Sequence, residues 1–167
     1  FALLILIWPL LFVIYIIIFF DIGSPLFIQK RVGKNKKIFN LLKFRTMKIG
    51  TPSLASHKIN SSCLSNTGKL LRKFKLDELP QLINVLKGEM SLVGPRPLLE
   101  EYLNYYSKDQ IKRHDCLPGI TGLAQINGRN KLSWNKKFEY DLEYLNNINF
   151  INDMKIIIKS ILIIFQF

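Results

Sequence analysis

The stretch FALLILIWPLLFVIYIIIFF, Phe1–Phe20, carries no charged side chain and is about as long as a helix that crosses a lipid bilayer. Pro9 lies near its middle, where it removes a backbone hydrogen-bond donor and its ring clashes with the carbonyl group one turn earlier. We therefore expect a kinked helix in a membrane. Two paths are open: the helix crosses the membrane, or it bends at Trp8-Pro9 and returns to the same face.

The chain as a whole is strongly basic, with 24 Lys and Arg residues against 12 Asp and Glu residues. Positive residues are enriched on the cytosolic side of membrane proteins and are attracted by anionic lipid headgroups. We therefore expect the bulk of the chain to lie in the cytosol against membrane lipid. A nucleic-acid-binding protein would also be basic, but neither zinc-finger spacing nor an aromatic RNA-binding strand occurs in the sequence, so no nucleic-acid partner is expected.

The cysteines and histidines do not predict a structural metal site or a disulfide. Cys63 and Cys116 form no CxxC pair, and neither His57 nor His114 has a second histidine at ligand spacing. We expect two reduced thiols in a reducing compartment.

The residues that follow the apolar stretch predict a mixed, α+β fold. Aliphatic and aromatic residues in 25–29 and 37–47 favour two strands, and the Gly33-Lys34-Asn35 turn between them predicts a hairpin. The Ser- and Asn-rich segment 49–68 predicts an exposed loop.

Helical spacing of apolar residues predicts several amphipathic helices. One is expected to start close to Asp77, because Pro80 is tolerated only in a first turn, and to end near Gly88. Others are expected at 68–74, 100–115, 132–148 and 152–167, with an irregular segment at 117–128.

The last of these helices has Lys155 and Lys159 on one narrow face and apolar residues nearly everywhere else, which favours the membrane interface over a buried core position. We expect two parts in the whole chain: a membrane helix at 1–22 and a single cytosolic domain at 23–167, with helices at the membrane surface.

Two adjacent carboxylates, Asp77 and Glu78, open the helix that contains Pro80. Acids are favoured near the positive end of a helix dipole, so the pair could be ordinary first-turn residues that the helix keeps ionised. However, Arg72 lies about one turn upstream, and the GPRP motif places Arg96 between two prolines. Guanidinium groups suit phosphate oxygens, carboxylates suit Mg²⁺, and an aspartate can attack phosphorus. The residues therefore predict a site for Mg²⁺ and a diphosphate substrate.

Four blocks carry a family resemblance: KFRTM, LDELPQLINVLKGEMSLVGPRP, RHDCLPGITGLAQINGRN and SWNKKFEYDLEYL. Their content and order resemble the bacterial sugar transferases, which are monotopic polyprenol-phosphate phosphoglycosyl transferases. The chain is especially similar to the small type that transfers phospho-N,N′-diacetylbacillosamine to undecaprenyl phosphate. The resemblance covers nearly the full sequence.

The resemblance implies a transferase at the cytoplasmic face of a bacterial inner membrane. The aspartate that matches Asp77 attacks the β-phosphorus of a UDP-sugar, UMP leaves, and the phosphosugar then passes to undecaprenyl phosphate. Glu78 matches a Mg²⁺-associated glutamate, whereas Arg72 and Arg96 match arginines that face phosphate. The sugar implied is an N-acetylated hexosamine, and downstream glycosyltransferases are possible partners.

Other matches to the family are less specific. Arg129 in NGRN and Asp153 in FINDMK match substrate-binding positions, with structural ion pairs as the alternative. The family breaks its re-entrant helix at Ser-Pro, and the serine is replaced here by Trp8 before Pro9. A non-catalytic scaffold that recruits glycosyltransferases is the alternative to an enzyme, and the presence of all four of Arg72, Asp77, Glu78 and Arg96 favours the enzyme.

Overall fold

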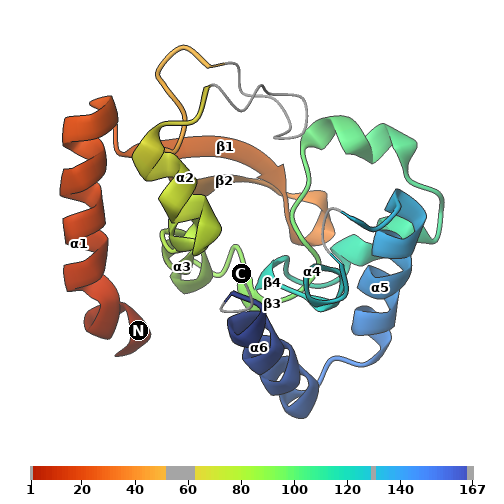
Figure 1. Cartoon of the computed structure of the whole chain (residues 1–167). Coiled ribbons are helices and arrows are strands. Elements are labelled where there is room, and N and C mark those ends of the chain that lie inside the picture. Colours follow the sequence, from red (N-terminus) through yellow and green to blue (C-terminus); the bar gives the residue numbers. More distant parts are fainter. Residues whose placement is uncertain (1, 52–62, 129–130, 165–167) are drawn as a thin grey trace. The chain divides into compact units, whose positions relative to one another are not determined.

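The computed structural model describes residues 2–51, 63–128 and 131–164, and it confirms a mixed fold of helices and small sheets (Figure 1). The chain groups into two compact units. The first unit comprises Phe1–Gln29 with Asn40–Leu86, and the second comprises Lys30–Phe39 with Lys87–Phe167. The expected boundary after residue 22 concerns placement in a membrane and stays a prediction.

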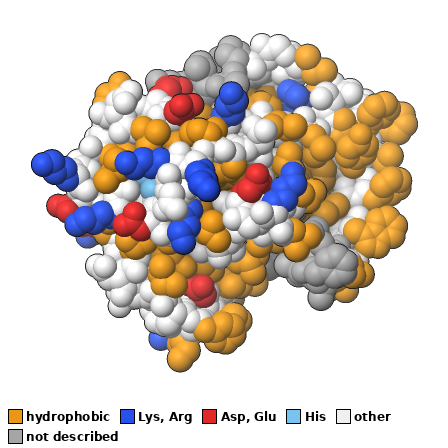
Figure 2. Space-filling view, turned by 180° about the vertical axis from the view of Figure 1, so that it is seen from behind, with side chains coloured by type: hydrophobic (Ala, Val, Ile, Leu, Met, Phe, Trp, Pro, Cys, Tyr) orange, Lys and Arg blue, Asp and Glu red, His pale blue; other side chains and the backbone are white. Residues whose placement is uncertain are grey.

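In the first unit, the apolar stretch forms helix α1, Ala2–Ile22, which continues through Pro9. Its window Ile5–Ile22 has a mean hydropathy of 2.7, and only 11% of it is buried within the chain, so α1 is long and apolar enough to cross a membrane by length and composition. Its exposed apolar side chains form the hydrophobic surface at the right of Figure 2. The re-entrant path at Pro9 stays a prediction.

One stripe of α1 is buried. Ile14 and Ile18 pack in a hydrophobic cluster with Phe44 and Leu71, and two further α1 residues, Leu11 and Ile22, lie partly buried against it. The spacing of three and four residues places this stripe on one face of the helix, so the remaining faces are the ones that stay exposed.

The predicted hairpin is confirmed. Strands β1, Leu26–Val32, and β2, Ile38–Phe44, pair in a two-stranded sheet around the short 3-10 turn Lys34–Lys36. Asn35 and Lys36 have positive φ angles in this turn.

Helix α2, Asn66–Lys73, starts two residues before the predicted Gly68, because the Ser65 hydroxyl accepts a hydrogen bond from the Gly68 amide and caps the helix. A short 3-10 turn, η4 (Leu76–Glu78), and helix α3, Gln81–Leu86, follow. Asn84 is fully buried and ties α3 to β2: its amide donates to the Asn40 carbonyl, and its oxygen accepts from the Leu42 amide.

In the second unit, strands β3, Ser91–Val93, and β4, Gly119–Thr121, pair in parallel, with Ser91 opposite Gly119. Helices α4 (Leu123–Ile126), α5 (Trp134–Asn146) and α6 (Phe150–Ile164) follow. The expected helix at 132–148 is thus confirmed, and the one at 152–167 is confirmed as far as Ile164, with the last three residues outside the described part of the chain. The segment expected to be irregular holds β4 and α4.

The single helix expected at 100–115 is wrong. The chain forms two 3-10 segments there, η5 (Glu100–Tyr105) and η6 (Gln110–His114). Ser107 and Gln110 exchange hydrogen bonds between their side chains and amides, so they start a new turn where the helix would have continued.

The core of the second unit forms where α5 and α6 contribute Tyr144 and Ile156 to a cluster with Val93 of β3. The other faces of α6 stay open, with Ile158 and Leu162 more than half exposed. One face of α6 therefore belongs to the core, and the membrane-interface position of its exposed faces stays a prediction.

Candidate active site

Asp77 and Glu78 lie in the 3-10 turn η4, not in the first turn of the helix expected from the sequence. Lys75 adopts a left-handed conformation, with φ of 59°, directly before the turn. Pro80 has no N–H to donate to the Leu76 carbonyl, and the Leu79 amide donates to this carbonyl instead, in the tighter 3-10 pattern. Since α3 has only six residues and starts at Gln81, the expected support of Asp77 by a helix dipole is wrong.

The Asp77 carboxylate is buried, with 8% of the residue exposed. Its Oδ1 atom has no hydrogen-bond partner among the residues that the structure describes. Burial and, secondarily, the neighbouring Glu78 raise the pKa of Asp77, while Lys43, Arg72 and Lys75 oppose the rise. The shift is opposite to the one expected at a helix N-terminus. A carboxylate poorly stabilised in this way is a better nucleophile than a solvated one.

Glu78 turns to a different partner. Its Oε1 accepts a hydrogen bond from Lys43 Nζ at 3.0 Å, in an ion pair whose side chains are 12% and 18% exposed. Lys43 belongs to the KFRTM block, for which the sequence indicated no role. The place of Lys43 in the KFRTM block was the one sign of a role that the sequence offered. The pairing of Lys43 with Glu78 could not be predicted, because the two residues lie 35 positions apart and no local pattern connects them.

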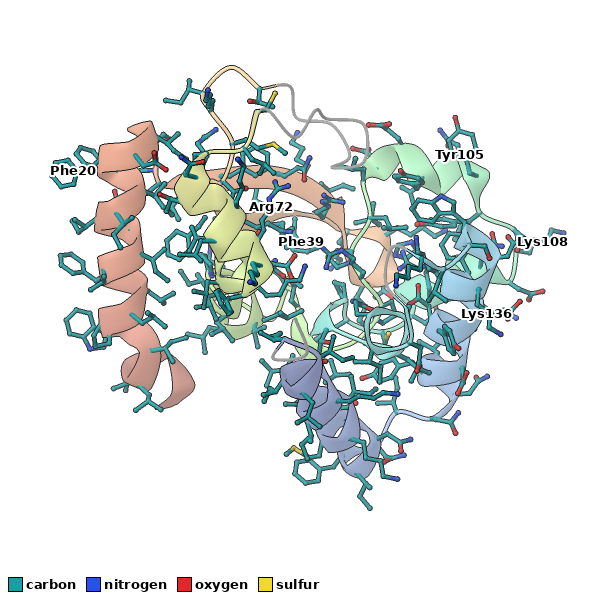
Figure 3. All side chains as sticks on the ribbon, in the orientation of Figure 1. Phe20, Phe39, Arg72, Tyr105, Lys108 and Lys136 are labelled. Carbon is teal, nitrogen blue, oxygen red and sulfur yellow. The ribbon has the colours of Figure 1, made fainter. Side chains whose placement is uncertain are left out.

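Arg72 projects from α2 (Figure 3). Its Nε donates to the buried Thr46 Oγ1 at 2.9 Å, which fixes one edge of the guanidinium group. Burial lowers the pKa of Arg72, and the charges of Asp77 and Glu78 act against this. The first unit therefore brings together two carboxylates and two cations, as a site for a negatively charged substrate requires.

The GPRP motif follows β3 in the second unit and leaves the Arg96 side chain exposed. Its backbone is closely packed. A Cβ on Gly119 would collide with the Gly94 amide, and a Cβ on Gly122 would collide with the Gly94 carbonyl. The glycines of the LPGITG segment thus allow its backbone to touch the backbone at Gly94. The backbone that carries the exposed Arg96 is therefore closely packed.

The structure places the two remaining predicted residues as follows. Asp153 lies in the first turn of α6, where its Oδ1 accepts a hydrogen bond from the Tyr144 hydroxyl at 2.9 Å. Arg129 lies outside the described residues. The substrate-binding roles of both stay predictions.

Asp77 and Glu78 are candidate donors for a magnesium ion. Among the residues described, no group of three His, Cys, Asp or Glu side chains could hold a metal ion. Mg²⁺ is commonly bound by one or two carboxylates together with substrate phosphates. The unpartnered Asp77 oxygen and the neighbouring Glu78 fit that arrangement, in which the diphosphate supplies the other ligands.

The chain is similar to a known protein family and to several known proteins. The family described as "Bacterial sugar transferase" matches residues 1–167. The chain is 52% identical over 141 residues to "Uncharacterized sugar transferase EpsL" of Bacillus subtilis (strain 168), a match that covers 84% of this chain and 70% of the relative.

Two relatives have names that state a reaction. "Undecaprenyl-phosphate galactose phosphotransferase" of Salmonella typhimurium is 35% identical over 91% of this chain and 36% of its own length. "UDP-glucose:undecaprenyl-phosphate glucose-1-phosphate transferase" of Xanthomonas campestris pv. campestris is 36% identical over 92% of this chain and 34% of its own length. The chain thus spans about a third of each of these two relatives, and the diacetylbacillosamine type stays a prediction. The match over all 167 residues shows that the chain belongs to the bacterial sugar transferase family.

Proposed function

We propose that this chain transfers a sugar 1-phosphate from a UDP-sugar to undecaprenyl phosphate and releases UMP. The observation that carries the proposal is the buried Asp77 carboxylate, whose Oδ1 lacks a hydrogen-bond partner among the described residues and which lies with Glu78, Lys43 and Arg72 in one unit. The names of the Salmonella and Xanthomonas relatives support this acceptor and this class of donor.

The reaction proceeds in two displacements at the same phosphorus. An Asp77 oxygen attacks the β-phosphorus of the UDP-sugar, the bond to the bridging oxygen breaks, and its electron pair leaves with UMP. A phosphate oxygen of undecaprenyl phosphate then attacks the phosphosugar on Asp77, and the bond electrons return to the carboxylate. Neither step needs a proton from the protein, because each nucleophile and each leaving group is an anion.

The cations of the first unit counter the negative charge of the substrate. Arg72 is held by Thr46 on one edge, so its remaining N–H groups keep a defined orientation toward phosphate oxygens. Glu78 is the residue we propose to hold Mg²⁺ together with the diphosphate. The bound ion would supply charge neutralisation for the departing UMP.

We further propose that the chain is seated at the cytoplasmic face of the bacterial inner membrane. The buried stripe of α1 at residues 11–22 packs in the cluster that includes Leu76 and Leu79, which flank the acid pair. This packing holds the acid turn beside the apolar helix, which supports a position of Asp77 close to the membrane and to the lipid acceptor.

The donor sugar is the finer part of the proposal. The resemblance favours an N-acetylated hexosamine, whereas the two relatives are named for galactose and glucose. A panel of UDP-N,N′-diacetylbacillosamine, UDP-N-acetylglucosamine, UDP-galactose and UDP-glucose, assayed for UMP release with undecaprenyl phosphate, identifies the donor.

The covalent step is tested without the acceptor. Wild-type protein given the UDP-sugar and Mg²⁺ should release up to about one equivalent of UMP and gain one phosphosugar on the peptide that contains Asp77. Asp77→Asn should show neither result, because an amide of nearly the same shape is a poor nucleophile. UMP release that requires undecaprenyl phosphate, or an adduct formed by Asp77→Asn, would show direct transfer in a ternary complex instead.

A further inference from the structure

The ion pair of Lys43 with Glu78 joins strand β2 to the acid turn. Lys43 Nζ donates to Glu78 Oε1 at 3.0 Å, and the two side chains are only 18% and 12% exposed. The neighbouring Asp77 is buried as well. Two carboxylates that leave water in one turn lose hydration and repel each other, so a positive charge beside them stabilises the site. Lys43 brings this charge to Glu78, the residue that we propose to hold Mg²⁺.

The backbones on both sides of the ion pair are fixed by their own contacts. Phe44 packs in the cluster whose partly buried members include Leu76 and Leu79, the residues on either side of the acid pair. The fully buried Asn84 makes two hydrogen bonds to β2, which tie α3 to the strand. A change of partner by Lys43 therefore requires rotation of its side chain and no movement of the backbone.

The two cations beside the acid pair are held in different ways. Arg72 Nε donates to the buried Thr46 hydroxyl, so its guanidinium group is anchored by an uncharged group outside the acid turn. Lys43 is a compact charge at the end of a flexible four-carbon chain, and it contacts the carboxylate itself. Rotation about its side-chain bonds carries this charge from one oxygen to another. Lys43 is thus the cation suited to an exchange of partners.

We infer that Lys43 occupies the place of the metal ion at Glu78 until the donor arrives, and that it then binds a phosphate oxygen of the donor. This inference rests on the proposed function, in which Glu78 holds Mg²⁺ together with the diphosphate. An ammonium group on Glu78 Oε1 repels a divalent ion that approaches the same carboxylate, so the acid turn binds an ion weakly while Lys43 stays there. The diphosphate supplies the negative charge that attracts Lys43 away from Glu78.

A purely structural ion pair makes the opposite prediction for metal binding. If Lys43 only orients the Glu78 carboxylate, its removal leaves the carboxylate misplaced and weakens the binding of a metal ion. If Lys43 competes with the ion, its removal strengthens that binding. The sign of the change in the Kd for the metal therefore separates the two roles.

The first test measures binding of Mn²⁺, used in place of Mg²⁺, to the whole protein in detergent without nucleotide. Lys43→Met and Lys43→Gln both remove the charge, and Lys43→Gln keeps an N–H donor for Glu78. Each should lower the Kd for Mn²⁺ roughly tenfold. Lys43→Arg keeps the charge and should not lower it. The matched control is Lys69→Met, at an exposed position on α2, which should leave the Kd unchanged.

The second test measures binding of UDP, which every candidate donor contains, by calorimetry at a saturating concentration of Mg²⁺. Lys43→Met and Lys43→Gln should each raise the Kd for UDP roughly tenfold, because a phosphate oxygen loses a charge-assisted hydrogen bond. Lys69→Met should again have no effect. A substitution that strengthens metal binding and weakens nucleotide binding is the signature of an exchanged partner.

Mn²⁺ binding that is unchanged or weaker in both neutral variants, or UDP binding that is unchanged in them, overturns the exchange and leaves the proposed function standing. If Glu78→Gln binds Mn²⁺ as the wild type does, the ion binds elsewhere, which overturns the metal role of Glu78 and this inference together. Absence of UDP binding by the wild type overturns the proposed function itself. Thermal unfolding identifies a variant that fails to fold, and Lys43→Gln alone decides if Lys43→Met does so.

Discussion

Two regions of the chain, the acid turn Leu76–Glu78 and the GPRP segment Gly94–Pro97, differ in how completely their polar groups are hydrogen-bonded. In the acid turn, a buried carboxylate oxygen of Asp77 has no hydrogen-bond partner within the described part of the chain. In the GPRP segment, the carbonyls of Pro95, Arg96 and Pro97 all accept hydrogen bonds. A buried polar group without a partner costs free energy, and such groups persist where function requires them. We therefore interpret the acid turn as the reacting centre and the GPRP segment as a rigid stretch of backbone that carries Arg96.

The largest effect should come from removing the metal-binding charge in the acid turn. Glu78→Gln keeps the size of the side chain but removes its charge, so we expect roughly a 100-fold loss of UMP release in the presence of Mg²⁺. EDTA should abolish turnover of the wild type, and added Mg²⁺ should restore it. Glu143→Gln, an exposed change on α5, serves as the control. Full activity of the wild type in EDTA would refute the role of the metal.

A smaller effect should follow from removing the cation that pairs with Glu78. Among the positive groups that lower the pKa of Asp77, Lys43 acts most strongly, so Lys43→Met should raise that pKa further. Since the attacking carboxylate must be ionised, the acidic limb of the pH–rate profile should move to higher pH, with roughly a tenfold loss at neutral pH. Lys69→Met, at an exposed position on α2, should leave the profile in place. If the acidic limb of the pH–rate profile does not move in Lys43→Met, Lys43 does not control the ionisation of Asp77.

Because the Asp77 carboxylate is buried and its Oδ1 has no hydrogen-bond partner among the described residues, we expect the fold to become more stable when this charge is removed. With a folded-state pKa above the unfolded value, Asp77 favours folding below the unfolded pKa, and this contribution is lost as pH rises through the folded pKa. Asp77→Asn should therefore raise the Tm by a few degrees at neutral pH, and the gain should shrink toward pH 4. A lower Tm for the variant at neutral pH would mean that the ionised carboxylate is well stabilised after all.

The smallest effect concerns the packing beside the GPRP segment. His114 is 4% exposed, and burial, followed by the charge of Arg113, lowers its pKa to about 4. The unfolded state therefore binds the proton more readily, so His114 costs stability as pH falls from about 6.5 toward 4. His114→Gln should lose less Tm than the wild type over this interval. Equal losses would remove His114 as the source of acid sensitivity in this region.

Much of the secondary structure could be predicted from local patterns. A few neighbouring residues are enough to predict several elements. They are the apolar helix α1, the turn of the hairpin, and the helices α5 and α6, whose apolar residues recur at helical spacing. The segment at 100–115 could not, because side-chain hydrogen bonds at Ser107 and Gln110 override a helical pattern that is otherwise acceptable.

The candidate site residues could be named from the sequence, because a residue's type and its flanking prolines can be read without knowing its neighbours in space; they are Arg72, Asp77, Glu78 and Arg96. Their environments could not be read in this way, because they depend on the fold. It buried Asp77, paired Glu78 with Lys43 and linked Arg96 to Arg113, 17 residues away. Burial and ion pairing arise where distant segments meet, and no local spacing encodes that meeting. The charge of a side chain is a property of the residue itself, whereas its solvation depends on the groups that the fold packs around it.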